Sequence, residues 1–191
     1  MNVLIAYATT EGQTRKIAEH LGDRIRGQGN RVCVLDTSLT DEATNIDGFD
    51  VYILAGSLHY NKHQPRLIEF AKRHAATLQR SHAAFLSVSA SAARTDEESL
   101  AAVRQCISDF IQETGWIPCA WLPVAGAMKY TKYNFILRAL LKHISKKNNG
   151  PTDTSKDHEF TDWHALEAFV DQFLKEKFVA QPKRRPEMIA S

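Results

Sequence analysis

The chain has 191 residues, of which 43% are hydrophobic, and 24 lysines and arginines against 22 aspartates and glutamates give a net charge of +2. This length fits one α/β domain with a full core, and the near-neutral charge balance gives no indication of nucleic-acid binding. No stretch approaches the roughly 20 apolar residues of a membrane-spanning helix, and no basic leader precedes the first apolar run. We therefore expect a protein that is neither exported nor embedded in a membrane.

The few cysteines are too scattered for a disulfide framework or a metal site. Each lies in an apolar context typical of a strand or helix, so we expect buried free thiols in a reducing cytoplasm and no bound metal. These residues are Cys33, Cys106 and Cys119.

The chain begins with an apolar strand at residues 2–7, followed at once by a turn rich in threonine and the start of a helix. Backbone N–H groups of such a turn and the positive end of the helix dipole can converge on an anion. The turn lacks the lysine of a triphosphate loop and the three glycines of a dinucleotide loop, which favours a single phosphate. A capped turn that binds nothing is the alternative. The turn consists of Thr9, Thr10, Glu11, Gly12, Gln13 and Thr14.

This turn resembles the flavodoxin fingerprint, in which a loop without cationic side chains binds the 5′-phosphate of FMN. Strands and helices alternate along the chain that follows, which predicts a doubly wound, flavodoxin-like α/β domain with a five-stranded parallel sheet in the order 2-1-3-4-5. The expected elements are a helix at 14–27, strands at 31–36 and 51–56, a helix at 65–78, a strand at 83–88, a helix at 97–113 and a strand at 119–124.

In such a sheet the ligand lies at the carboxyl ends of strands 1, 3 and 4. The loop after strand 3 offers an aromatic ring and two imidazoles, Tyr60, His59 and His63, that could flank a flavin ring, although all three could be ordinary solvated loop residues. The loop at 89–94 offers small residues that let a planar ring approach the backbone. Beyond the phosphate loop, the predicted cofactor residues are Ser57, Leu58, His59, Tyr60, Ser87, Val88, Ser89, Ala90 and Ser91.

After the last strand the regular pattern is interrupted by a basic insertion at about 126–158, whose stretch from 126 to 150 contains no acidic residue. Its apolar and basic residues separate onto opposite faces of a helix. This pattern is typical of a helix that binds an anionic lipid surface, an anionic ligand or an acidic partner. An ordinary packed helix is the alternative. The residues predicted to contact substrate or membrane are Lys129, Tyr130, Lys132, Tyr133, Arg138 and Lys142, with Phe135, Lys146 and Lys147 in the same segment.

A last helix is expected to begin near Phe160, with Thr161 or Asp162 as its cap. Its core-facing stripe is predicted to be Trp163, Leu166, Phe169, Val170 and Phe173. We expect the flavodoxin-like domain to span residues 1–178 and residues 179–191 to form a basic, disordered tail.

Several motifs together resemble the flavodoxin-like, quinone-dependent protoporphyrinogen IX dehydrogenase family of bacterial haem biosynthesis. The resemblance covers about residues 1–175, and the basic insertion distinguishes this family from simple electron carriers. The motifs are the phosphate loop at 9–14, Ala55-Gly56-Ser57-Leu58-His59-Tyr60, Ser87-Val88, Val124-Ala125-Gly126-Ala127-Met128-Lys129-Tyr130, Thr152-Asp153-Thr154 and Phe160-Thr161-Asp162-Trp163.

The resemblance implies an FMN-dependent oxidoreductase acting on CH–CH groups, which converts protoporphyrinogen IX to protoporphyrin IX. Electrons would pass to menaquinone or ubiquinone at the cytoplasmic face of the inner membrane, where the protein would be peripheral. His59 and His63 are weak candidates for accepting a pyrrole proton. The alternative functions are a flavodoxin-type electron carrier and a soluble NAD(P)H:quinone reductase. The sequence leaves open whether the protein forms a homo-oligomer.

Overall fold

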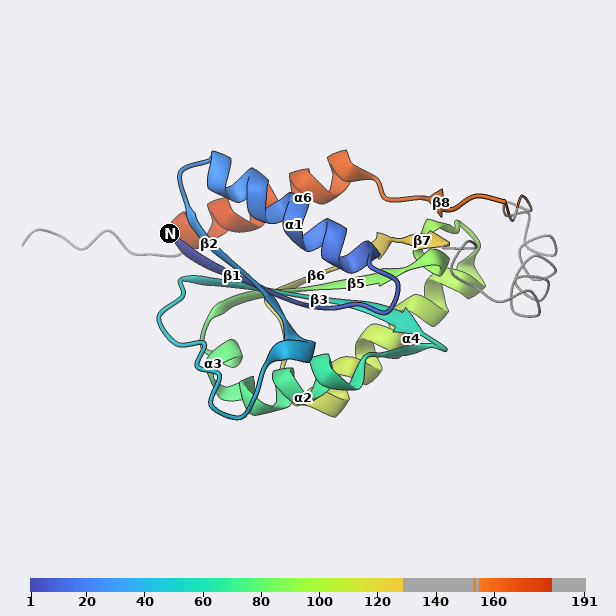
Figure 1. Ribbon diagram of the computed structural model, residues 1–191. Coiled ribbons are helices and arrows are strands. Elements are labelled where there is room, and N and C mark those ends of the chain that lie inside the picture. The colour runs from blue at the N-terminus through green and yellow to red at the C-terminus, as the bar shows by residue number, and fades with distance from the viewer. Residues whose placement is uncertain (129–152, 154, 180–191) are drawn as a thin grey trace, which may run out of the picture.

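The computed structural model describes residues 1–128, 153 and 155–179. A central sheet lies between two layers of helices (Figure 1). All five long strands are parallel and follow the order β2-β1-β3-β5-β6. This is the predicted order 2-1-3-4-5, because β4 (Lys62–His63) is a short strand that pairs antiparallel with the end of β3. The long strands are β1 (Asn2–Ala8), β2 (Arg31–Asp36), β3 (Val51–His59), β5 (His82–Ser89) and β6 (Ala120–Ala125).

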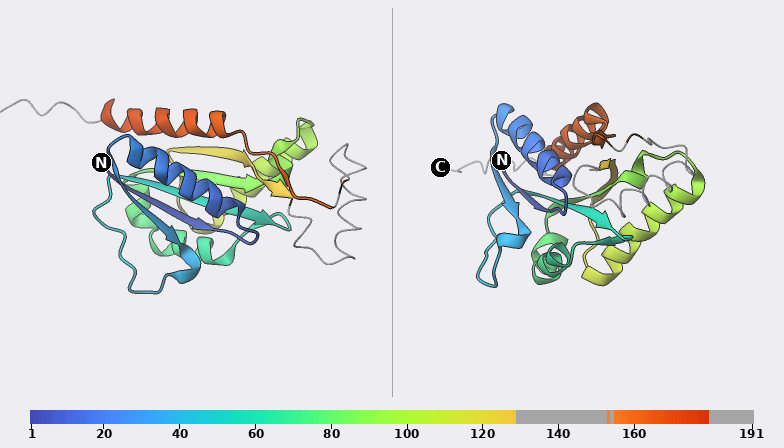
Figure 2. Two further views of the ribbon diagram at one scale, coloured as in Figure 1. Left: turned by 45° about the horizontal axis from the view of Figure 1, so that its top comes forward. Right: turned by 45° about the vertical axis from the view of Figure 1, so that its right-hand side comes forward.

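Helices α1 (Gln13–Gly27) and α6 (Trp163–Val179) cover one face of the sheet, as the two rotated views also show (Figure 2). The other face carries α2 (Pro65–Arg73), α3 (Ala75–Gln79) and α4 (Glu97–Thr114). Alternate residues of β3 enter the two cores: Ile53 packs on the α1 side and Leu54 on the α4 side. Both are fully buried, which explains the unbroken apolar sequence of this strand.

The helix predicted at 65–78 is divided in two at His74, whose backbone leaves the helical region at φ −102° and ψ 11°. The His74 N–H still donates to the Phe70 carbonyl at 3.1 Å, and its ring packs against the Phe70 ring at a centroid distance of 4.7 Å. The prediction of one continuous helix is therefore wrong. The sequence does not reveal the break, because no glycine or proline marks it and the apolar spacing continues across it.

The expectation of three buried thiols is wrong for two of them. Cys106 on α4 is buried, but Cys33 and Cys119 are exposed. Cys33 lies on β2, which is an edge strand, and Cys119 lies in the turn before β6, the other edge of the sheet. An apolar run at an edge strand therefore does not ensure that every side chain in it is covered.

Helix α6 begins as predicted, and Asp162 is its cap, since its Oδ1 accepts from the Ala165 N–H at 2.9 Å. Leu166, Val170 and Phe173 are buried, and Trp163 and Phe169 are partly buried against the same core. Leu174 joins this core as well.

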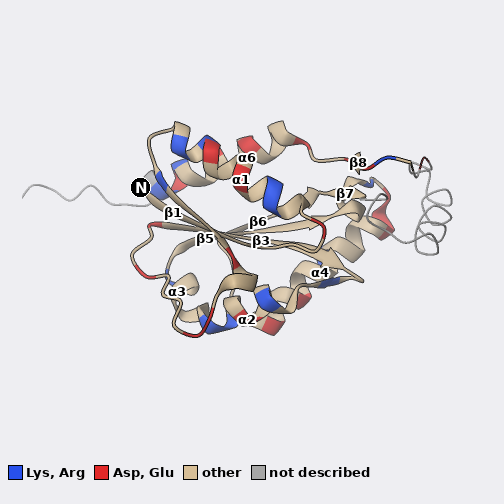
Figure 3. Cartoon of the chain, viewed as in Figure 1, with Lys and Arg blue, Asp and Glu red and all other residues tan. Residues whose placement is uncertain are grey.

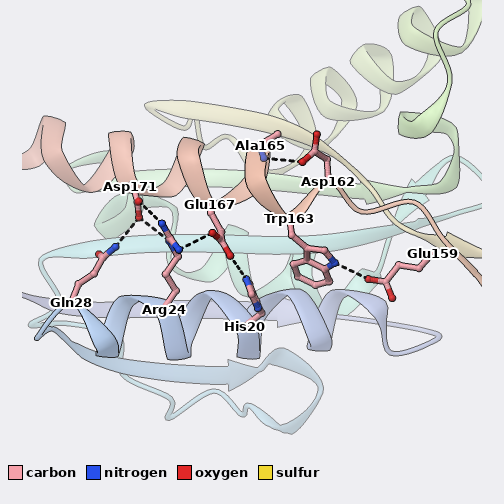
Figure 4. A network of polar contacts seen from close by, with 9 residues as sticks. All are labelled: His20, Arg24, Gln28, Glu159, Asp162, Trp163, Ala165, Glu167 and Asp171. Atoms are coloured by element: carbon pink, nitrogen blue, oxygen red, sulfur yellow. Dashed lines mark hydrogen bonds and ion pairs between the residues drawn. The ribbon is translucent and has the colours of Figure 1, made fainter.

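A polar network fastens α6 to α1 (Figure 4). The Arg24 guanidinium contacts Glu167 at 2.7 Å and forms a two-point contact with Asp171 at 3.1 and 2.7 Å. His20 contacts the same Glu167 at 2.7 Å, and Gln28 donates to Asp171 at 2.8 Å. The network thus holds the C-terminal helix against the helix that follows the predicted phosphate loop.

The two described ends of the predicted insertion lie together, because β7 (Ala127–Met128) and β8 (His158–Glu159) form an antiparallel pair. The chain therefore leaves the end of β6 and returns beside it before α6 begins. The substrate or membrane residues predicted between Lys129 and Lys147 lie outside the described residues, as does the tail predicted at 179–191 except for Val179, which is the last residue of α6. Within the part of the chain that is described, no helix is long and apolar enough to cross a membrane.

Candidate functional site

The loop between β1 and α1 has the form of an anion site. Gly12 is the N-cap of α1 in the left-handed region, at φ 95°, and the helix has no side-chain cap. The Gly12 N–H donates to Thr9 Oγ1 at 2.9 Å, which closes the turn. The first N–H groups of a helix have no carbonyl partner within it, so they are free to bind an anion beside the positive end of the dipole.

Two side chains at the start of α1 carry buried polar atoms without a partner among the described residues. Thr14 is fully buried and Gln13 is 5% exposed. Among the described residues, Thr14 Oγ1 and Gln13 Oε1 have no hydrogen-bond partner. A buried polar atom without a partner costs about 1–3 kcal/mol, and a phosphate oxygen at the loop would satisfy the Thr14 hydroxyl. The residues present therefore fit a phosphate group.

The phosphate loop forms one side of a cleft of about 240 Å³ at the carboxyl ends of the strands. Its walls come from the carboxyl ends of β3 and β5 and from the segments that follow β1, β3, β5 and β6, where a doubly wound sheet places its ligand. The predicted cofactor residues that line it are Thr9, Thr10, Glu11, Gln13, Ser57, Leu58, His59, Tyr60, Val88, Ser89 and Ala90. Gly126, Ala127 and Met128 complete the wall, although the sequence analysis did not assign them to the cofactor.

Four predicted residues do not line the cleft: Gly12, Thr14, Ser87 and Ser91. Gly12 is the left-handed N-cap of the loop, and Thr14 is the buried residue whose hydroxyl has no partner among the described residues. Ser91 lies in the 3₁₀ turn η2 (Ala90–Ala93), which Ser89 caps by accepting from the Ala92 N–H. Ser87 is fully buried outside the cleft lining, and its hydroxyl contacts a buried side chain.

His63 is the partner of that serine, with 3.0 Å between its Nε2 and Ser87 Oγ. Its ring packs edge-on against Phe85 and Phe110, at 5.1 Å from each. Burial lowers the pKa of His63 to about 4. The expectation that two imidazoles flank a flavin ring is therefore wrong for His63, whose side chain belongs to the core, while His59 lines the cleft.

A tight hairpin joins β3 to β4 at the mouth of the cleft. His59 pairs with Lys62, and the two residues between them, Tyr60 and Asn61, have φ values of 50° and 59°. Such angles are typical of a two-residue hairpin turn, and side chains other than glycine adopt them at a cost. Cys106 on α4 supports the turn, since its Sγ lies 3.3 Å from the Asn61 carbonyl oxygen.

This turn places an aromatic ring in solvent beside the cleft. Tyr60 is 80% exposed, and its ring meets that of His59 edge-on at 4.5 Å. A large apolar ring so exposed at the edge of a cleft is suited to cover a planar ligand.

Gln64 is a site residue that the sequence analysis missed. Its Nε2 donates to Thr10 Oγ1 at 3.2 Å and also to Ser57 Oγ, so it joins the phosphate loop to the carboxyl end of β3. Nothing in the local sequence signals this role, because a glutamine before a proline reads only as the start of a helix. Among the described residues, no cluster of His, Cys, Asp and Glu could hold a metal ion.

A sequence model of the flavodoxin domain matches residues 4–155, so the chain belongs to the flavodoxin domain family. A solved structure of oxidised Flavodoxin 1 from Bacillus cereus aligns with a TM-score of 0.52 over 92% of this chain and 98% of that one. Their sequence identity is 16%, so this likeness concerns the fold. FMN is the cofactor of this family, and the cleft with its phosphate loop is the place that fits it.

Within the curated proteins, the chain is similar to protoporphyrinogen IX dehydrogenase [quinone]. The Escherichia coli K12 protein of that name is 30% identical over 170 residues, which cover 89% of this chain and 93% of the relative. The Leishmania major protein of the same name is 26% identical over 180 residues, covering 94% of this chain and 78% of the relative. The resemblance found in the sequence motifs is thus confirmed over most of the chain.

Proposed function

We propose that this protein oxidises protoporphyrinogen IX to protoporphyrin IX with FMN as cofactor and a quinone as electron acceptor. The observation that carries the proposal is the match to the Escherichia coli protoporphyrinogen IX dehydrogenase [quinone], which extends over 89% of the chain. The match thus includes the cleft and the segment after β6, in addition to the phosphate loop that all flavodoxins share.

Bound FMN would supply a two-electron acceptor, and the residues of the chain would bind and orient the reactants. The loop at 9–14 would hold the phosphate through backbone N–H groups and the buried Thr14 hydroxyl. Gln64 would hold Thr10 and Ser57 in register across the cleft. Tyr60 and His59 would form an outer wall against a planar ring system.

Oxidation of a porphyrinogen also releases protons from its pyrrole nitrogens and bridging carbons. Of the two histidines considered from the sequence, His59 supports this role by its place in the cleft. His63 is a poor candidate, because its side chain is buried outside the cleft lining and its lowered pKa makes it a weak proton acceptor.

The insertion would serve the large substrate, the quinone or both. Its described ends, β7 and β8, lie at the cleft, since Ala127 and Met128 line it. Residues 129–147 carry six of the chain's cations and no acid, a composition suited to the propionates of a tetrapyrrole or to an anionic membrane surface. We propose a peripheral association with the cytoplasmic membrane on this basis.

The direct test is anaerobic turnover of the FMN-loaded protein with protoporphyrinogen IX and a soluble quinone, followed by porphyrin fluorescence. We expect protoporphyrin to form only when both protein and quinone are present. A second arm replaces the porphyrinogen with NADPH and follows the flavin absorbance. Rapid bleaching by NADPH, together with no protoporphyrin in the first arm, would instead identify a quinone reductase.

A further inference from the structure

The side-chain amide of Gln13 is held in one orientation by a residue almost 150 positions away. Gln13 Nε2 lies 3.0 Å from Thr161 Oγ1, which in turn lies 2.7 Å from the Ala125 carbonyl oxygen. A hydroxyl group has a single hydrogen, and the Ala125 carbonyl can only accept. The Thr161 oxygen must therefore accept from Gln13, so the nitrogen end of the amide faces Thr161.

A carboxylate next to Thr161 favours the same orientation. Burial raises the pKa of Glu159, but hydrogen bonds from Lys16, Gln13 and Trp163 and the Lys16 charge outweigh burial and lower it. A carboxylate can only accept, so Gln13 again presents its nitrogen. Glu159 is itself fixed, with 2.6 Å to Lys16 Nζ and 3.0 Å to Trp163 Nε1. Figure 4 shows Glu159 and Trp163 at the start of the α1–α6 contact.

The other end of the Gln13 amide is left without a partner. Its Oε1 is buried and accepts no hydrogen bond from the described residues, and Gln13 lines the cleft. A phosphate group would not satisfy this atom, because a carbonyl oxygen and a phosphate oxygen are both acceptors. The atom requires an O–H or N–H donor from whatever occupies the cleft.

We propose that Thr161 is a positioning residue of the cofactor site, which holds Gln13 Oε1 as an acceptor for an O–H or N–H group of the bound flavin. FMN offers both kinds of donor, hydroxyl groups on its side chain and an N–H on its ring. The segment that enters α6 is thereby a part of the cofactor site, although it does not line the cleft. This inference rests on the cofactor of the proposed function and is independent of its substrate.

The test compares two substitutions at Thr161 by flavin fluorescence titration of the apoprotein. Thr161→Val removes the hydroxyl at constant volume, and losing one neutral hydrogen bond should raise the Kd for FMN about three- to tenfold. Thr161→Ser keeps the hydroxyl and should stay within about twofold of the parent. Thr114→Val is the matched control, because the buried Thr114 hydroxyl on α4 likewise donates to a backbone carbonyl, that of Phe110 at 2.8 Å, away from the cleft.

Three probes identify the donor: FMN, riboflavin and lumiflavin, which has the ring without the hydroxylated chain. If Thr161→Val weakens the binding of FMN and riboflavin but not that of lumiflavin, Gln13 accepts from a hydroxyl group of the flavin side chain. If all three weaken, Gln13 accepts from the ring N–H. A loss confined to FMN would mean that the effect passes through the phosphate, which a carbonyl oxygen cannot bind, and would overturn the proposal.

A double-mutant cycle keeps the inference testable if one variant is poorly folded. Gln13→Leu should weaken FMN binding at least as much as Thr161→Val does. The double variant should bind FMN no more weakly than Gln13→Leu alone. Additive losses, or equal Kd values for Thr161→Val and Thr114→Val, would overturn the inference. A parent protein that fails to bind FMN would instead contradict the proposed function itself, so the two failures are distinguishable.

Discussion

At the scale of single residues, Thr14 combines full burial with a hydroxyl that has no partner in the described chain. We predict that Thr14→Val weakens FMN binding about ten- to a hundredfold, because a hydrogen bond to a charged group contributes about 1.5–3 kcal/mol. The same change should leave the apoprotein as stable as the parent or more so, since it removes an unsatisfied buried group. Fluorescence titration and urea unfolding measure the two effects. A variant that loses stability but keeps its flavin affinity would refute the assignment.

His63 provides a prediction about pH. Its pKa of about 4 in the folded protein lies below the ordinary value of 6.5, so the unfolded chain binds more protons between these values. The contribution to stability is present above pH 6.5 and is lost as the pH falls toward 4. From pH 7 to pH 5 the loss should be about 2 kcal/mol from this group.

The measurement is urea unfolding at both pH values for the parent and for His63→Gln. The variant should show a smaller fall in unfolding free energy, because its side chain does not titrate. His74, whose pKa is also lowered by burial, adds a fall of the same sign in both proteins. If the unfolding free energy of the variant falls between pH 7 and pH 5 by as much as that of the parent, His63 is not the group responsible for this pH dependence.

At the scale of elements, the contact between α1 and α6 depends on Arg24, which reaches two carboxylates from one guanidinium. Arg24→Leu should lower the unfolding free energy by about 1–2 kcal/mol, since it leaves Glu167 and Asp171 without their common cation. Arg26→Leu is a suitable control, because the ion pair of Arg26 is with the exposed Asp23 on its own helix, at 2.9 Å, and its other bond is to the Val32 carbonyl on β2, so neither contact involves α6. That pair should contribute less than about 0.5 kcal/mol. Equal losses in urea unfolding would show that the network does not hold α6.

The β7–β8 pair permits a clean removal of the insertion. Met128 pairs directly with His158, so residues 129–157 can be replaced by an Asn-Gly turn that closes a hairpin. We predict that this variant folds and binds FMN, because the phosphate loop and the hairpin after β3 are retained, but no longer oxidises protoporphyrinogen. A shortened protein that forms protoporphyrin at the parental rate would place the substrate elsewhere.

At the scale of the whole molecule, charge is unevenly distributed along the chain. On the described helices α1 and α2, acidic and basic residues are interspersed (Figure 3). The segment 129–147 instead contains six lysines and arginines and no aspartate or glutamate. Because each cation near an anionic surface contributes about 1 kcal/mol, neutralising Lys142, Lys146 and Lys147 should weaken binding to anionic vesicles about a hundredfold. Sedimentation with vesicles at low and high salt measures this. Equal pelleting of parent and variant would argue against a membrane role.

The sequence by itself determined the features that depend on contiguous residues. The strands, their order in a doubly wound sheet and the loop at 9–14 follow from short-range patterns, because a buried parallel strand must be apolar throughout and a phosphate loop is built from consecutive residues. Most residues of the cleft were predictable for the same reason, since they directly follow predicted strands.

Only the tertiary structure decided features that join distant segments. Identical residue types four positions apart had opposite outcomes: His59 lines the cleft, whereas His63 is buried against Ser87 because β4 folds back beside β3. The bonds of Gln64 to the phosphate loop and of Gln13 to Thr161 have no local signature. A hydrogen bond depends on position in space, and residues 13 and 161 come together only after α6 has packed against α1.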